Sequence, residues 1–449
     1  MKLVLSVLIL IKGISLFGQF DFKSLSTEQS VESFSVLETF PEIKDYDLIF
    51  YGFLHGAEIP QKIDCRILKE LIDEGFCNYA PEISYVQAFF MNKFLATGNN
   101  TLLKYVLQTY RAPQDASLQW IDKFQIIYHY LQDQNKEFQI IGTDREDSAE
   151  LIITFLSHLL GERETGNPAV DSLHLFKDLE PDLTLISMGP LFKMASKIYN
   201  EGGDVDALLY SNDSQNQYSK RFIEYYYKDK SKFHKYFGDD SLKVIRVFDS
   251  FNHDKNRIKR EETIIKNFER DIIPLIDKGH KVYSNFGYAH VLQSKLNGSS
   301  YLAAELKSRH PNLKIFTLLS HMKDSEVLID RKLCKSDKIK RQGKKLKTAK
   351  VCGAINSKED DGDSENEKVK GIKELNAVTG QGKIRTILIS ELPEELTSNL
   401  YFLDYEIGKN SSRMEFSSIL NTQDYYQGLI FIKGSRPNIP YEMTDIKIR

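Results

Sequence analysis

The chain has 449 residues, 41% of them hydrophobic and 11% aromatic, which is enough to bury a large core in one domain with an insertion or in two domains. Its formal net charge of −3 gives no indication of a nucleic-acid partner. The four cysteines have no Cys-x-x-Cys spacing, so they indicate neither a zinc knuckle nor a disulfide-dense scaffold, while a Cys65–Cys77 bridge stays open.

Residues 1–19 have the pattern of an export signal. Lys2 supplies a positive start, Leu3 to Ile11 form a short apolar run, and Ser15–Gln19 is the expected processing region. We therefore predict a signal peptide over 1–19 and an exported protein, periplasmic or secreted. The alternative is a cytosolic protein with an apolar N-terminus, since Lys12 interrupts the run. No later segment approaches the roughly 18 consecutive apolar residues of a membrane span, so no span is expected.

Strand and helix patterns alternate after a Ser-rich leader at 20–45. Buried strands are predicted at Tyr46–Gly52, Asn78–Pro81 and Phe138–Gly142. The helical patterns between and after them cover Lys62–Glu74, Ser84–Thr97, Thr101–Tyr110, Leu118–Gln134 and Ser148–Leu160. This alternation predicts an α/β fold with a mainly parallel central sheet and crossover helices, over a domain at 46–325.

A helical subdomain is expected as an insertion at about 161–255, where strand patterns are rare. Its helical pieces are predicted at Leu191–Tyr199 and Tyr218–Tyr227. An amphipathic helix at Asn256–Asp277, which Pro274 would kink, then leads to strands at His280–Phe286 and Leu313–Leu319.

The C-terminal part has a different character. Residues 326–380 hold a basic run followed by an acidic run, which is typical of a flexible charged insertion. Residues 381–449 are predicted to form a β-rich extension, with strands at Arg385–Ser390, Leu400–Leu403 and Leu429–Lys433.

Polar residues follow the predicted strands where each strand ends. His55 and His290 each stand in a Gly-x-x-His turn, while Glu82 and Asp144 follow the second and third strands. Because ligands of open parallel sheets bind beyond the carboxyl ends of the strands, we expect three or four strands to deliver these side chains to one edge. A histidine beside a carboxylate can activate water or a hydroxyl, and two histidines with a carboxylate can bind a metal.

Structural roles stay open beside these chemical ones. Both histidines could be hydrogen-bonded structural residues, and Glu82 could form a salt bridge or cap a helix. Glu261 and Glu262 suit the start of the helix that leads to the fourth strand. Arg260 could instead face the crevice and stabilise an oxyanion or carboxylate.

These residues resemble the erythromycin esterase-like family, whose superfamily also holds ChaN-like haem-uptake proteins and, more distantly, Tiki/TraB metalloprotease-like proteins. The family motif Gly-Glu-x-His-Gly stands here as Gly52-Phe53-Leu54-His55-Gly56, with Phe53 in place of the glutamate. Later motifs match in order, over roughly residues 46–320, at Glu82, at Arg260-Glu261 with Asn267, and at His290.

The resemblance implies hydrolysis of an ester or related small molecule without a metal, so no cofactor is expected. In that reading His55 is the general base, Glu82 and His290 orient water and substrate, and Arg260 stabilises negative charge. Asp144 and Glu261 would contact the substrate. Two alternatives stay open: a catalytically decayed binding protein for haem or another ligand, which the apolar Phe53 favours, and a metal-dependent peptidase.

Overall fold

A computed structural model describes residues 20–109, 116–176, 214–251, 257–296, 298–330, 351–356, 369, 371–403, 417 and 419–439. The predicted signal peptide, the helical piece at Leu191–Tyr199 and most of the charged run lie outside these ranges. In the part of the chain that is described, no helix is both long and apolar enough to cross a membrane.

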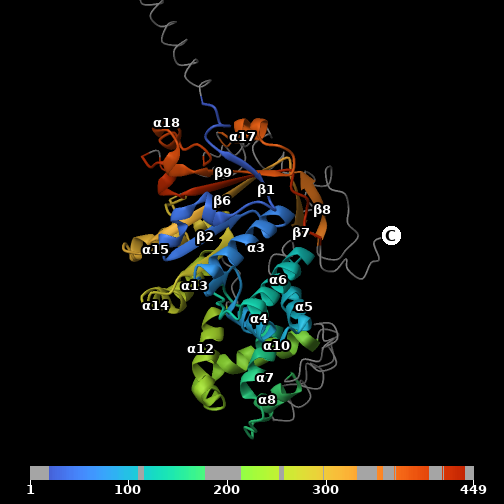
Figure 1. The fold of residues 1–449 in the computed structure, drawn as a ribbon. Coiled ribbons are helices and arrows are strands. Elements are labelled where there is room, and N and C mark those ends of the chain that lie inside the picture. Colours follow the sequence, from blue (N-terminus) through green and yellow to red (C-terminus); the bar gives the residue numbers. More distant parts are fainter. Residues whose placement is uncertain are drawn as a thin grey trace, which may run out of the picture.

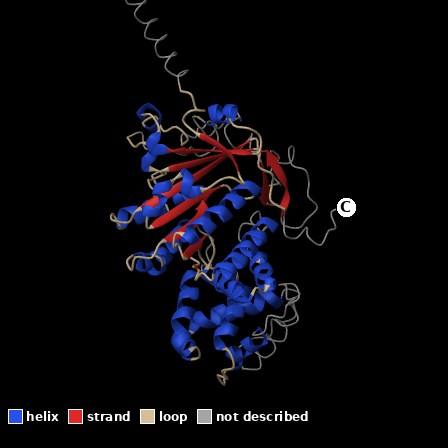
Figure 2. Cartoon of the chain, viewed as in Figure 1, coloured by secondary structure: helices blue, strands red, loops and turns tan. Residues whose placement is uncertain are grey.

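An eight-stranded sheet made from the described residues forms the centre of the fold, with helices on both of its faces (Figures 1 and 2). Its strands, in spatial order, are β1 (Thr27–Ser30), β9 (Lys383–Leu388), β10 (Gly428–Lys433), β6 (Ile315–Lys323), β2 (Leu48–Phe53), β5 (Val282–Gly287), β3 (Asn78–Pro81) and β4 (Gln139–Ile140). All neighbours from β10 to β4 are parallel, whereas β9 runs antiparallel to β1 and β10. The predicted α/β class with a mainly parallel sheet is confirmed.

The strand β2 lies in the middle of this sheet and is buried along its whole length. It pairs with β5 on one side and β6 on the other, so both faces can be covered by helices. Its side chains alternate: Tyr51 and Phe53 belong to the core cluster that includes α3 (Glu58–Asp73), whereas Phe50 packs against Phe268 of α13 (Arg257–Asp271).

The other α-helices differ widely in length. They are α2 (Val36–Thr39), α4 (Tyr85–Thr97), α5 (Asn100–Gln108), α6 (Leu118–Gln134), α7 (Ala149–Leu160), α8 (Pro168–Asp171), α10 (Ser214–Lys228), α11 (Lys230–Lys235), α12 (Ser241–Ser250), α14 (Ile273–Ile276), α15 (Leu302–Arg309), α17 (Ile372–Val378) and α18 (Glu394–Thr397).

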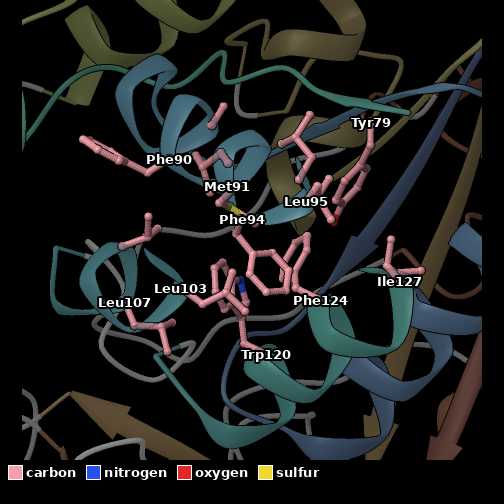
Figure 3. Packing of buried hydrophobic residues seen from close by; sticks show 14 of the residues in the cluster. Tyr79, Phe90, Met91, Phe94, Leu95, Leu103, Leu107, Trp120, Phe124 and Ile127 are labelled. Atoms are coloured by element: carbon pink, nitrogen blue, oxygen red, sulfur yellow. The ribbon is translucent and has the colours of Figure 1, made fainter. Parts of the chain in front are cut away.

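The helices α4, α5, α7, α8, α10 and α12 gather in a lobe beside one end of the sheet (Figure 1). The described parts of the predicted insertion are helical, but the lobe already begins at α4. This helix is apolar on several sides, so it packs against α5 and α7 as well as near the sheet. Figure 3 shows Phe94 of α4 facing Trp120 and Phe124 of α6.

Several predicted elements have different bounds. The expected strand Leu400–Leu403 is wrong, because Leu400 and Phe402 have positive φ angles of 55° and 65° that no strand accommodates. The predicted helix Asn256–Asp277 is interrupted after Asp271, because Pro274 has no N–H to continue the helical hydrogen bonds. The third strand contracts to Gln139–Ile140.

The segments at the two ends of the chain join the central sheet. The leader at 20–45 contributes β1, which pairs with β9, and the C-terminal extension contributes β9 and β10. The described parts of the charged insertion contain the antiparallel pair β7 (Glu326–Asp330) and β8 (Val351–Asn356), and the helix α17.

Cys65 and Cys77 are free thiols, so the bridge between them is not formed.

Candidate active site

Polar side chains from four neighbouring strands meet at the carboxyl edge of the sheet. His55 follows β2, His290 lies in the 3-10 turn after β5, Glu82 follows β3 and Asp144 follows β4. These strands lie side by side in the order β2-β5-β3-β4, so their ends converge. The structure therefore brings together the residues that the strand pattern predicted at one edge.

His55 and Glu82 form the centre of the cluster. The His55 Nε2 atom lies 3.7 Å from Glu82 Oε2, and the two side chains are 23% and 17% exposed. The ring of Phe53 stands edge-on to the His55 imidazole at a centroid distance of 5.2 Å, and it stacks on Tyr51. The imidazole is thus placed between a carboxylate and an aromatic wall, while a part of it stays accessible.

Gly287 makes this close arrangement sterically feasible. Its backbone N–H donates a 2.8 Å hydrogen bond to Glu82 Oε2. A Cβ atom at this position would lie 3.2 Å from His55 Nε2 and 3.6 Å from Glu82 Oε2. The sequence indicated only a turn glycine here, so its role as a donor between the two side chains was missed.

Arg260, from the first turn of α13, ties the carboxylates together. Its Nε donates to Asp144 Oδ1 at 2.9 Å, and its Nη2 donates to Asp144 Oδ2 at 2.5 Å and to Glu82 Oε1. Its Nη1 lies 3.3 Å from His290 Nε2. Since a guanidinium has five N–H groups, these four contacts leave one N–H of Nη1 for another acceptor.

The charges in this cluster hold one another in the ionised form. Burial by itself would raise the pKa of Glu82, but Arg260, His290 and His55 outweigh it and lower this pKa to about 2. Burial would likewise lower the pKa of Arg260, but Asp144 and Glu82 raise it above its ordinary value. Glu82 is therefore a carboxylate, able to stabilise a positive charge on the imidazole of His55.

His290 is held in a defined orientation. Its Nδ1 lies 2.7 Å from Glu261 Oε2, and Glu261 Oε1 accepts the N–H of Leu302 at 2.7 Å. Arg260 and Glu261 therefore face the two different nitrogens of the His290 ring. Glu261 thus lies behind His290 and anchors it.

Asn267, which also matched the family pattern, lies outside the cluster and bonds the backbone beside Asp144. It is 2% exposed, and its Nδ2 donates to the carbonyl oxygen of Thr143 at 2.8 Å. This bond holds the chain immediately before Asp144.

A buried polar network that the sequence did not reveal lies on the α3 side of the sheet. The carboxylate of Asp64 is 0% exposed and accepts hydrogen bonds from Lys123 Nζ at 2.6 Å, Tyr283 OH at 2.6 Å and Asn285 Nδ2 at 2.9 Å. The backbone carbonyl oxygen of Asn285 accepts a hydrogen bond from the backbone N–H of Glu82. The network therefore contacts the strand ends that carry the site.

Glu146 is a second buried group without a sequence signal. Its carboxylate is 1% exposed and accepts the N–H of Val86 at 2.9 Å in the first turn of α4. Its own N–H donates to the carbonyl oxygen of Ser250 at the end of α12. Burial raises the pKa of Glu146 to about 7, against the opposing effects of hydrogen bonds from Ser84 and Val86.

Glu146→Gln is expected to change how stability depends on pH. A carboxyl group with a raised pKa stabilises the fold fully below its unfolded value of 4.5, and this contribution is lost as pH rises through about 7. The free energy of unfolding of the variant, relative to wild type, should therefore rise by about 3 kcal/mol between pH 4.5 and pH 8. Urea unfolding of both proteins across this range measures the difference, and a constant difference would contradict the burial argument.

The carboxylates and histidines of the cluster are residue types that can bind a metal ion. Within the described ranges, no group of three or more His, Cys, Asp and Glu side chains could hold a metal ion. Glu82, Asp144 and His290 Nε2 all face the guanidinium of Arg260, which occupies the place that a cation would need. These residues therefore do not fit a metal centre of the peptidase kind.

The sequence matches no family model and no curated protein. Among solved structures, the chain is similar to a protein from Bacillus cereus with a TM-score of 0.55 and 12% identity, over 93% of this chain and 97% of that one. A structure described as a succinoglycan biosynthesis protein gives a TM-score of 0.55 and 11% identity, covering 93% and 96%. A mutant of the erythromycin esterase EreC in its open conformation gives a TM-score of 0.51 and 11% identity, over 92% of this chain and 98% of that one. These values establish a shared fold.

Proposed function

We propose that the protein is a hydrolase of esters or related small molecules, in which His55 activates water. The observation that carries the proposal is a partly accessible imidazole whose Nε2 lies 3.7 Å from an ionised Glu82, at the ligand-binding edge of a parallel sheet. The export pattern at residues 1–19 supports action outside the cytoplasm.

In the proposed reaction His55 takes a proton from a water molecule as the oxygen of that water attacks the ester carbonyl carbon. Glu82 stabilises the imidazolium that forms. The remaining N–H of Arg260 Nη1 stabilises the carbonyl oxygen as it becomes negative. The tetrahedral intermediate then collapses: the carbon–oxygen bond to the alcohol breaks, and the alcohol oxygen receives the proton from His55. The products are one acid and one alcohol.

The remaining residues position these groups. Asp144 and Glu82 hold Arg260, and Glu261 holds His290, so that His290 can orient the substrate or the water. Asp144 and Glu261 would reach the substrate through these two residues. The fold shared with the EreC structure supports an ester hydrolase as the class. This chain has Phe53 where the erythromycin esterase-like motif has a glutamate. Glu82 would therefore supply the carboxylate beside His55.

The proposal is tested with the variant His55→Gln. Loss of a general base should lower the rate of ester hydrolysis by about 10²–10⁴-fold. The melting temperature should stay within about 2 °C of wild type, because glutamine keeps a polar side chain of similar size at this partly exposed position. The matched control is His129→Gln, since His129 is an exposed histidine on α6. Equal rates for His55→Gln and wild type would contradict the proposal.

A second candidate is a ligand-binding protein on the same scaffold. The observation that favours it is Phe53, whose ring replaces a carboxylate with apolar surface beside His55. Haem added to purified protein would then give a shifted visible absorption band that His55→Ala removes. Ester turnover that depends on His55, without such a band, decides for the hydrolase.

A further inference from the structure

The C-terminal segment Ser435–Ile439 crosses the chain immediately after His55. The N–H of Asn438 donates to the carbonyl oxygen of Gly56 at 2.9 Å, and the N–H of Glu58 donates to the carbonyl oxygen of Arg436 at 2.9 Å. Between these two bonds, Ala57 and Pro437 form an antiparallel bridge. The segment thus acts as a short additional strand along Gly56–Glu58.

Both ends of this segment are anchored. Beyond the bridge, Ile439 accepts the N–H of Leu118 at 2.9 Å and donates its own N–H to Gln119 Oε1 at 2.9 Å, at the start of α6. At the other end, the N–H of Ser435 donates to Ser325 Oγ at 2.9 Å. Ser435 and Asn438 are 3% and 2% exposed. The segment is therefore fixed through the buried Ser435 and Asn438, whereas Arg436 and Ile439 are exposed.

The segment also supplies a cap that α3 lacks. The residue before this helix is Ala57, which has no side-chain group to accept a hydrogen bond from the first turn. The N–H of Glu58 is satisfied by Arg436 instead, and the N–H of Ile59 donates to Ser435 Oγ at 3.0 Å. Two of the N–H groups that every helix start leaves without an intrahelical partner are thus satisfied by residues nearly 380 positions away in sequence.

The location of this contact links it to the site. Gly56 directly follows His55 and has a φ of 90°, a backbone conformation that glycine alone adopts readily. A glycine at this position also gives the loop freedom to leave that conformation unless its carbonyl oxygen and the following residues are bonded. The bonds from Asn438, Arg436 and Ser435 provide this restraint.

We propose that Ser435–Ile439 is a positioning segment for His55: by bonding Gly56–Ile59 from the far end of the chain, it keeps the imidazole facing Glu82. The catalytic consequence rests on the proposed hydrolase function, but the structural consequence does not. The site is complete only when the C-terminal segment has docked after β10.

The test uses full-length variants of the segment. Ser435→Ala removes the acceptor for Ile59, and the double variant Ser435→Ala/Asn438→Pro also removes the donor to Gly56. Ser435→Thr keeps the hydroxyl and serves as the conservative control. Hydrogen exchange of the peptide that contains Gly56–Ile59 reports the bonds, and it should become about tenfold faster in Ser435→Ala and return to the wild-type rate in Ser435→Thr.

A second readout reports the position of His55 without any substrate. Carbethoxylation of His55, measured by mass spectrometry relative to the exposed His129 of the same molecule, should be faster in both Ala-containing variants than in wild type. Where an ester is hydrolysed, kcat should fall several-fold with KM unchanged. Unchanged exchange at Gly56–Ile59, or faster exchange with an unchanged His55-to-His129 ratio, would overturn the proposal. A wild-type protein inert towards esters would affect only the function proposal, because the other two readouts need no turnover.

Discussion

Arg260→Met is expected to lower the free energy of unfolding by about 3–5 kcal/mol near pH 7 and to abolish hydrolysis. Arg260 is 12% exposed and donates to the 8% exposed Asp144 and the 17% exposed Glu82. Methionine keeps much of the volume but leaves the two largely buried carboxylates without the guanidinium that both of them bind. Such a loss of one partner costs more than the pair itself contributes.

The pH dependence provides an internal check on this result. In wild type, the lowered pKa of Glu82 adds stability that is present above its unfolded value of 4.5 and is lost as pH falls towards about 2. In Arg260→Met the part of this contribution that comes from Arg260 is lost, so the stability gap to wild type should be largest near neutral pH and should narrow below pH 4. Urea unfolding at several pH values measures the gap.

Arg309→Met is the matched control for this experiment. Arg309 pairs with Glu269 and Glu305, but its side chain is 48% exposed. Exposed ion pairs contribute little, so the control should stay within about 1 kcal/mol of wild type. An Arg260→Met protein that is equally stable at pH 7 would show that the guanidinium does not hold the two carboxylates.

Asp64→Leu is expected to lower the free energy of unfolding by a similar amount, about 3–5 kcal/mol, because it leaves the buried Lys123 without its carboxylate partner. Lys123 is 3% exposed, and its Nζ lies 2.6 Å from the Asp64 carboxylate. Removing that carboxylate leaves a buried ammonium group beside the hydroxyl of Tyr79, at 3.0 Å, and the ring of Phe124, whose centroid lies 4.6 Å away. The single variant should therefore be strongly destabilised.

The double variant Asp64→Leu/Lys123→Met separates this effect from lost packing. It removes both charges and keeps apolar volume, so it should be more stable than Asp64→Leu alone by about 2 kcal/mol. Lys136→Met, which affects the exposed pair of Lys136 and Asp73, is the control and should change stability by less than about 1 kcal/mol. Equal stability of the single and double variants would contradict the account of a buried, charge-balanced network.

The part of the site that lies on parallel strands could be predicted from sequence. Apolar runs that end in His55, Glu82 and His290 mark strand ends, and parallel strands place their ends at one edge. The meeting of these residues therefore follows from local patterns and a general rule of topology. The strand order β2-β5-β3-β4 decides which site residues are neighbours. This order results from pairing between strands distant in sequence, which no local sequence pattern indicates.

Contacts made by backbone groups escaped prediction for a physical reason. The bond from the N–H of Gly287 to Glu82, and the backbone bonds that Arg436 and Asn438 make with Glu58 and Gly56, use atoms that nearly every residue has. The apolar side chains of Leu400–Leu403 match those of a strand, whereas Leu400 and Phe402 have left-handed backbone conformations. The burial of Glu146 and Lys123 has no local sequence pattern, since burial of a charged side chain depends on partners distant in sequence.

The central claim is that His55 acts as the general base for the attack of a water molecule on an ester carbonyl carbon. It is tested most directly by incubating the full-length protein with a panel of neutral esters in water enriched in ¹⁸O, with His55→Gln in parallel. We predict that one ¹⁸O atom enters the acid product and none enters the alcohol, and that His55→Gln forms almost no product. Hydrolysis by His55→Gln at the wild-type rate, ¹⁸O in the alcohol, or no hydrolysis of any ester by wild type would contradict the claim.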